Sequence, residues 1–202
     1  MERYPWSELI DTWFAETLDD AGAIPARMAW WFGPDPKRDA MLGERFSPLL
    51  DDCAAGLNFR WLDHPEGRLA MVITLDQLPR NLFRGQARAF AHDAYTAALC
   101  LAAAASGEDR KLTPIQRAFL YMPLQHFEDL AAQQAGVELY QSLANDTPDL
   151  PFFREGFLPY AEQHRDIIAR FGRFPHRNQT LERVDTPGEE AYLAAGAPRF
   201  GQ

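Results

Sequence analysis

Hydrophobic residues recur three and four positions apart along most of the chain, the spacing that places them on one face of an α-helix. In residues 5–18, for example, Leu9, Ile10, Trp13 and Phe14 form one apolar stripe. No segment alternates convincingly between apolar and polar residues, so no strand is predicted. The pattern predicts an all-α protein, with helices over residues 5–18, 37–56, 66–78, 86–106, 113–122, 126–144, 152–171 and 186–195.

The expected helix boundaries follow from capping residues, glycines and prolines. Thr113 and Thr186 each precede a proline and stand three positions before Gln or Glu, which predicts capped helix starts. Gly107 and Gly172 follow periodic runs and predict helix ends. Pro79 predicts the end of the helix over 66–78, because the residue before a proline avoids helical backbone.

Short connections between these helices predict antiparallel helical pairs in one domain over residues 1–202, with a loose tail from about residue 196. No Gly- or Ser-rich linker divides the chain. The pattern leaves two architectures open, a plain helical bundle and a solenoid of helical hairpins.

The acidic composition narrows the range of partners. The 202 residues include 20 Lys and Arg against 29 Asp and Glu, a formal net charge of −9. Such a surface repels phosphate backbones and anionic lipids, so we predict neither nucleic-acid nor membrane binding. The most apolar segment, residues 94–105, is shorter than the roughly 20 residues of a membrane span. Cys53 and Cys100 lack metal-type spacing and are expected to be reduced, as in a cytoplasmic protein.

Two of the predicted helix ends share a proline followed by polar residues. The first reads PRNLFR over residues 79–84 and the second reads PHRN over residues 175–178. Helix ends hold donors at fixed positions, so we expect the two ends to face each other across one polar pocket. The side chains expected to bind a ligand there are Gln77, Arg80, Asn81, Arg84, Arg177 and Asn178.

A carboxylate is expected to point into this pocket from the preceding helix. Asp76 lies seven and three residues after Leu69 and Ile73, on the same apolar stripe. Because an unpaired buried charge is costly, Asp76 needs a cationic partner. Arg80, four residues later, and Arg177, across the pocket, are the two candidates. A structural ion network between helix ends is the alternative interpretation.

Histidines near the same segments supply the candidate acid–base groups. His176 and His164 are the candidate proton carriers, and Asp76 completes the candidate catalytic set. No spacing typical of metal ligands occurs, so neither a metal nor another cofactor is predicted. The charged segment HFED, residues 126–129, is interpreted as the first turn of the next helix, where carboxylates complement the helix dipole. A metal or general-base site formed by His126, Glu128 and Asp129 is the alternative.

Four long blocks of the sequence resemble one bacterial family. AWWFGPDPKRDAMLGERF, LAMVITLDQLPRNLFRGQARAFAHDA, LTPIQRAFLYMPLQHFEDLAAQQ and YAEQHRDIIARFGRFPHRN are similar, in this order, to the family known as domain of unknown function 924. The resemblance runs from about Trp30 to Tyr192. It implies an all-α fold like that of tetratricopeptide-repeat hairpins, and it implies no established activity. Family members tend to have PLEHSED where this chain has Gln125 and Phe127, which weakens an acid–base role for that segment.

These observations support three hypotheses. In the first, Arg80, Arg84 and Arg177 bind a small anionic ligand, such as a carboxylate or phosphate, in a pocket that could also be catalytic. In the second, a helical-repeat groove binds a protein or peptide, including its terminal carboxylate, without catalysis. In the third, the polar motifs only join helix ends.

Overall fold

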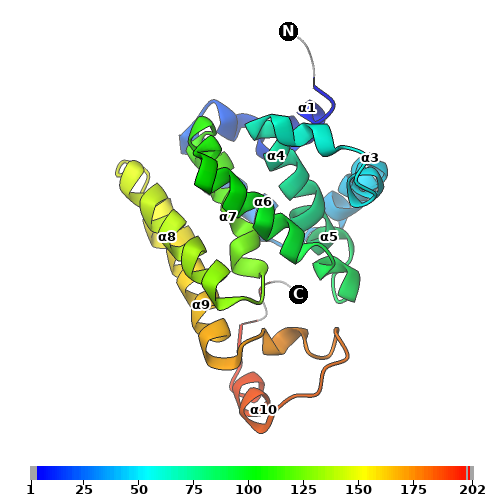
Figure 1. The fold of residues 1–202 in the computed structure, drawn as a ribbon, viewed down its shortest axis with the longest axis vertical. Helices are drawn as coiled ribbons and strands as arrows, with labels where there is room; N and C mark the ends of the chain where they lie inside the picture. Colours follow the sequence, from blue (N-terminus) through cyan, green and yellow to red (C-terminus); the bar gives the residue numbers. More distant parts are fainter. Residues whose placement is uncertain (1–3, 199, 201–202) are drawn as a thin grey trace.

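The computed structural model describes residues 4–198 and 200, and every regular element in these residues is helical (Figure 1). The all-α prediction is therefore confirmed. The α-helices are α1 (Ser7–Phe14), α2 (Ile24–Phe32), α3 (Pro36–Ala54), α4 (Pro65–Val72), α5 (Leu78–Leu82), α6 (Asp93–Ser106), α7 (Pro114–His126), α8 (Leu130–Asp146), α9 (Leu158–Phe171) and α10 (Pro187–Ala194). The π-helical turns are η4 (Ile73–Gln77) and η7 (Phe153–Phe157). The 3-10 turns are η1 (Ala15–Leu18), η2 (Ala21–Ala23), η3 (Phe59–Asp63), η5 (Ala87–Phe90), η6 (Glu108–Lys111) and η8 (Pro175–Arg177).

Helix α7 and the turn η4 are among the most enclosed elements, since nearly every residue of each is buried. α8 packs against both α7 and α9, and Figure 1 shows α8 and α9 as a long pair at one side of the molecule. α7 also packs on α6, and α4 contacts both α6 and α7. Along residues 69–78, from α4 through η4 into α5, every side chain is buried. The tetratricopeptide-like arrangement of these pairs remains a prediction.

The predicted capping residues act as the sequence indicates. Thr113 and Thr186 each complete a capping box with the side chain three residues later, Gln116 and Glu189 respectively. Gly172 ends α9 in the left-handed region, with φ 71°. A residue with a Cβ is disfavoured in that backbone conformation. These boundary predictions are therefore confirmed.

The prediction that a helix stops before Pro79 is wrong. The helical path continues from α4 through the π-helical turn η4 into α5, which contains Pro79. In this turn the Leu78 amide bonds to the carbonyl of Ile73, five residues back. A proline ring inside a regular α-helix clashes with the carbonyl four residues earlier, and the wider π turn relieves that clash. The same device precedes Pro159, where the turn η7 leads into α9.

None of the helices that the structure describes combines the length and the hydropathy needed to cross a bilayer. Most buried apolar side chains form one continuous core. A second, smaller cluster is formed by Ile167, Ile168 and Phe174, with Phe171, Tyr192 and Phe200 packed against it. This second cluster joins the end of α9 to the segment that contains PHRN, so it holds one of the two predicted helix ends.

Candidate functional site

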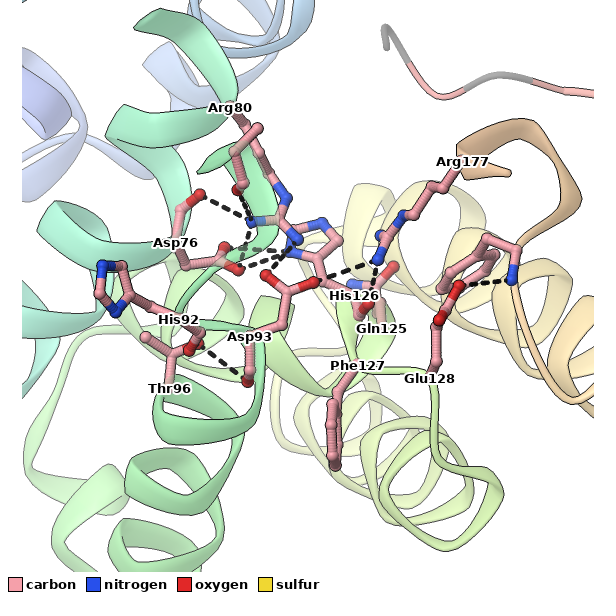
Figure 2. A network of polar contacts seen from close by, with 12 residues as sticks. Asp76, Arg80, His92, Asp93, Thr96, Gln125, His126, Phe127, Glu128 and Arg177 are labelled. Carbon is pink, nitrogen blue, oxygen red and sulfur yellow. Dashed lines mark hydrogen bonds and ion pairs between the residues drawn. The ribbon is translucent and has the colours of Figure 1, made fainter. Parts of the chain in front are cut away.

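Asp76 is at the centre of a buried polar network that joins η4, α5, α6 and α7 (Figure 2). Its side chain has no solvent exposure, which confirms that it points inward. One carboxylate oxygen lies 3.1 Å from Nη1 of Arg80, and the two oxygens lie 2.9 and 3.0 Å from Nδ1 of His126. The Gln77 amide donates to the same carboxylate at 2.6 Å. Of its two predicted cationic partners, Asp76 therefore contacts Arg80.

The two predicted helix ends do meet, and Asp93 is the residue that joins them. Asp93, the first residue of α6, is 2.8 Å from Nη2 of Arg80 through one oxygen and 3.1 Å from Nη1 of Arg177 through the other. Arg177 also donates to the main-chain carbonyl of His126 at 2.9 Å. Figure 2 shows the two guanidinium groups on either side of this carboxylate. All three charged side chains are buried.

Two aromatic rings pack on the guanidinium of Arg177, and one of its edges lacks a hydrogen-bond partner. Its central carbon lies 4.4 Å from the ring centre of Phe90 and 4.4 Å from that of Phe174. Nη1 makes the contacts with Asp93 and His126, whereas Nε is buried without a hydrogen bond to any described residue. Burial lowers the pKa of Arg177 to about 10, against the opposing effect of Asp93. The cation is therefore only partly compensated by its neighbours.

The ionisation states of Asp76 and His126 are fixed by their surroundings. Burial by itself raises the pKa of Asp76, but the charge of Arg80 and the contact with His126 lower it to about 2. Burial, followed by the charge of Arg80, lowers the pKa of His126. The pair at neutral pH is thus a carboxylate and a neutral imidazole. Because the carboxylate only accepts, Nδ1 of His126 carries the proton and Nε2 carries a lone pair.

The Nε2 atom of His126 makes no hydrogen bond within the described part of the chain. The His126 side chain is 18% exposed, in contrast to the fully enclosed Asp76 that orients it. A carboxylate on one imidazole nitrogen fixes the tautomer and leaves the other nitrogen as a base. Chemically, the pair can accept a proton at Nε2 and stabilise the resulting imidazolium.

His164 and His176, the predicted proton carriers, lie beside this network. His164 donates from Nδ1 to the carbonyl of Tyr160 at 2.7 Å, and its ring centre lies 6.3 Å from that of His126. Burial lowers the pKa of His164 to about 3, so the ring is neutral. His176 lies with its ring centre 5.5 Å from that of Phe174.

Asn81 and Arg84 belong to a second cluster on another side of α5. The Asn81 carbonyl oxygen accepts from Arg38 and from Arg84, each at 3.0 Å, and Nε of Arg84 lies 3.3 Å from Asp39. The Asn81 amide donates to the main-chain carbonyl of Gln77 at 2.9 Å. This cluster ties α5 to the start of α3.

Asn178 belongs to a third cluster, in the segment after η8. Its amide donates to Asp185 at 2.6 Å, and its oxygen accepts from Arg183 at 2.9 Å. Arg183 in turn binds both oxygens of Glu128, at 2.6 and 2.9 Å. The single pocket expected from the sequence is therefore divided, because Asn81, Arg84 and Asn178 have local partners that draw them away from Asp76.

The interpretation of residues 126–129 as a helical first turn is wrong for two of its members. His126 is the last residue of α7, and Glu128 lies between helices. Only Asp129 caps α8, accepting from the Ala132 amide at 2.8 Å. The error arose because Phe127 interrupts the helix with extended backbone.

Asp93 and His126 were not placed in the predicted pocket by the sequence analysis. A usable signal was present for Asp93, which lies four and seven residues before the buried Ala97 and Cys100. Asp93 therefore lies on the apolar stripe of α6, as Asp76 lies on the stripe of its own helix, and is expected to point inward. Within residues 4–198 and 200, no three His, Cys, Asp or Glu side chains are grouped as metal ligands would be.

Comparison with known proteins places the chain in a family. A model of the family described as bacterial protein of unknown function, DUF924, matches residues 9–197. The chain belongs to this family. It is also similar to a solved structure from Agrobacterium tumefaciens, described as protein of unknown function ATU0120. The two chains share 36% sequence identity and superpose with a TM-score of 0.79, with 95% of this chain and 97% of the other covered. No curated protein matches the chain.

The DUF924 match confirms the family resemblance that the four sequence blocks indicate. The family description gives no activity, and neither does that of the Agrobacterium tumefaciens protein. The groups that remain chemically available in the network are the unsatisfied edge of Arg177 and Nε2 of His126.

Proposed function

We propose that the protein binds a small organic anion at the unsatisfied edge of Arg177, and that Nε2 of His126 takes up a proton when the anion binds. The observation that carries the proposal is the buried Nε of Arg177, which makes no hydrogen bond to any described residue. Leaving a buried donor unpaired costs about 1 to 3 kcal/mol, and more for a charged group. An anion that accepted from this edge would remove that cost.

The aromatic rings of Phe90 and Phe174 support this role for Arg177, because they fix the plane of the guanidinium. A planar fork held in one orientation matches a carboxylate or phosphate and loses little entropy on binding. Arg80 and Arg84, predicted to share the task, are occupied instead. Arg80 contacts two carboxylates, and Arg84 contacts Asp39 and Asn81.

The proton-transfer part of the proposal depends on the Asp76–His126 pair. Its members come from two elements far apart in the sequence, and Asp76 lies in a π-helical turn. Such turns are rare and frequently occur at functional sites. An anion bound beside His126 would raise the pKa of this neutral imidazole, because opposite charges favour the protonated form. Binding would therefore be accompanied by proton uptake on His126.

The anion-binding step is tested by calorimetry and thermal unfolding with acetate and phosphate, at constant ionic strength. Arg177→Lys keeps a positive charge near Asp93 but removes the fork, so we expect it to abolish the melting shift caused by either anion. The matched control is Arg173→Lys. Arg173 is an arginine of the same segment that binds Glu189 outside the network. Equal anion binding by wild type and Arg177→Lys would refute the proposal.

The proton-transfer step is tested by measuring the binding enthalpy in buffers of different ionisation enthalpy. We expect proton uptake by the wild type at neutral pH, none by His126→Gln, and unchanged uptake by the control His92→Gln. His92 is a half-buried histidine just before α6. Anion binding that depends on Arg177 without proton uptake would favour the peptide-carboxylate alternative, in which no base is needed.

A further inference from the structure

The side chain of Phe200 lies on the face of His164. The two ring centres are 3.8 Å apart with an interplanar angle of 31°. Phe200 also makes edge contacts with His176 and Phe174, at 5.5 and 6.5 Å between ring centres. It is partly buried against the small cluster of Ile167, Ile168 and Phe174. Its ring therefore fills an aromatic-walled position beside His164.

This position adjoins the groups assigned to the anion. Phe174, one wall of the position, also packs on the guanidinium of Arg177 at 4.4 Å. His164, on whose face Phe200 stacks, has its ring centre 6.3 Å from that of His126. A ligand that reached both the position of the Phe200 ring and the edge of Arg177 would combine a planar apolar part with a negatively charged end. Arg177, with its planar fork, and the ring of Phe174 are fixed relative to each other by their mutual contact.

Phe200 is less buried than the core aromatics and has a strained backbone conformation. Its φ of 50° lies in the left-handed region, which residues other than glycine, asparagine and aspartate rarely adopt. It is only partly buried, whereas Phe174 and Phe153 have no exposed surface. A ligand ring of the same shape that displaced Phe200 would release this backbone strain.

We infer that the position filled by Phe200 is an aromatic subsite, and that the ligand of the proposed anion site is a small aromatic carboxylate whose ring replaces Phe200 on His164. This inference rests on the proposed function for its charged end. The neutral imidazole face of His164 and the ring of Phe174 favour a planar aromatic ring, because aromatic pairs gain from stacked and edge-to-face contacts. Phe200 then competes with the ligand and weakens its binding.

The test compares phenylacetate with acetate and phosphate on the full chain, by calorimetry at constant ionic strength. In the wild type we expect phenylacetate to bind about tenfold more tightly than acetate, from burial of one ring. Phe200→Ala removes the competing ring, so we expect it to tighten phenylacetate binding by a further factor of about five to ten. Binding of acetate and phosphate should change less than twofold. The matched control is Phe59→Ala, since Phe59 is an exposed phenylalanine in η3.

Two failures are distinguishable in this design. If acetate and phenylacetate bind equally, each dependent on Arg177, and Phe200→Ala changes neither, then the aromatic subsite is refuted and the anion site stands. If phenylacetate binds wild type and Arg177→Lys equally, the anion site is refuted, and with it the assignment of an aromatic carboxylate. Weaker phenylacetate binding by Phe200→Ala would also refute the inference, since Phe200 would then be a wall rather than a competitor.

Discussion

The charge state of Asp76 gives the sharpest test of the network, and Asp76→Asn is the variant to measure. In the wild type this buried carboxylate contacts Arg80 and His126. Removing one member of a buried ion pair typically costs about 3 to 5 kcal/mol. Arg80 keeps Asp93 as a second partner at 2.8 Å, so we expect the lower end of that range, about 3 kcal/mol at pH 6.

The pH dependence of this loss follows from the pKa of Asp76. Its pKa falls from the ordinary 3.8 to about 2 in the folded protein. A lowered acid pKa stabilises the fold above the unfolded-state value, and this stabilisation disappears as the pH falls through the folded-state value. With about 1.4 kcal/mol per pKa unit, the contribution is roughly 2 kcal/mol, lost between about pH 4 and pH 2. The stability difference between wild type and Asp76→Asn should shrink by this amount.

The assay is urea unfolding followed by circular dichroism at several pH values between 6 and 2. Leu42→Ala is the matched control, because Leu42 is fully buried and carries no titrating group. Its loss of about 3 kcal/mol should be independent of pH. A difference between wild type and Asp76→Asn that stays constant from pH 6 to pH 2 would show that Asp76 is not held ionised by Arg80 and His126.

Further predictions concern other buried groups. Tyr140→Phe should lower the free energy of unfolding by about 1 to 3 kcal/mol, because the hydroxyl accepts from Gln125 at 2.8 Å and donates to a main-chain carbonyl at 2.7 Å. Gly172→Ala should lower it by about 1 to 2 kcal/mol through its φ of 71°, with no steric clash. Burial raises the pKa of the Cys53 and Cys100 thiols, so a thiol reagent should label the native protein only as fast as it unfolds.

Local sequence signals were enough to predict most of the helices. Apolar stripes and capping boxes act within a few residues, so α1, α7 and α10 could be recognised without tertiary information. The continuation of the helix through Pro79 could not be predicted from local signals. It depends on the burial of residues 69–78 on all sides, which favours keeping one helical path and accommodating the proline with a π turn. Tertiary packing overrides the local preference of the residue before proline.

The candidate site was predictable only in part. The inward direction of Asp76 followed from its stripe, and its contact with Arg80 followed from their spacing of four residues. The contacts of Arg177 with Asp93 and with the His126 carbonyl join residues 84 and 51 positions apart. No local rule specifies such pairs. Asn178 was misplaced because Asp185 and Arg183, a few residues further on, satisfy it locally.

The difference between Arg80 and Arg177 bears most directly on function. Both are buried and both bind Asp93, so a purely structural clamp would be expected to satisfy each guanidinium in the same way. Arg80 meets that expectation, with carboxylates at 2.8 and 3.1 Å and main-chain carbonyls at 3.0 and 3.3 Å. In Arg177 only Nη1 contacts a carboxylate and a main-chain carbonyl, and the buried Nε makes no hydrogen bond to any described residue. Natural proteins pair nearly all buried polar atoms. Nε of Arg27 and Nε of Arg68 are also buried without a hydrogen bond in the described part of the chain, but Arg177 alone of these three arginines belongs to the network around Asp76, so a missing acceptor should be sought at its edge.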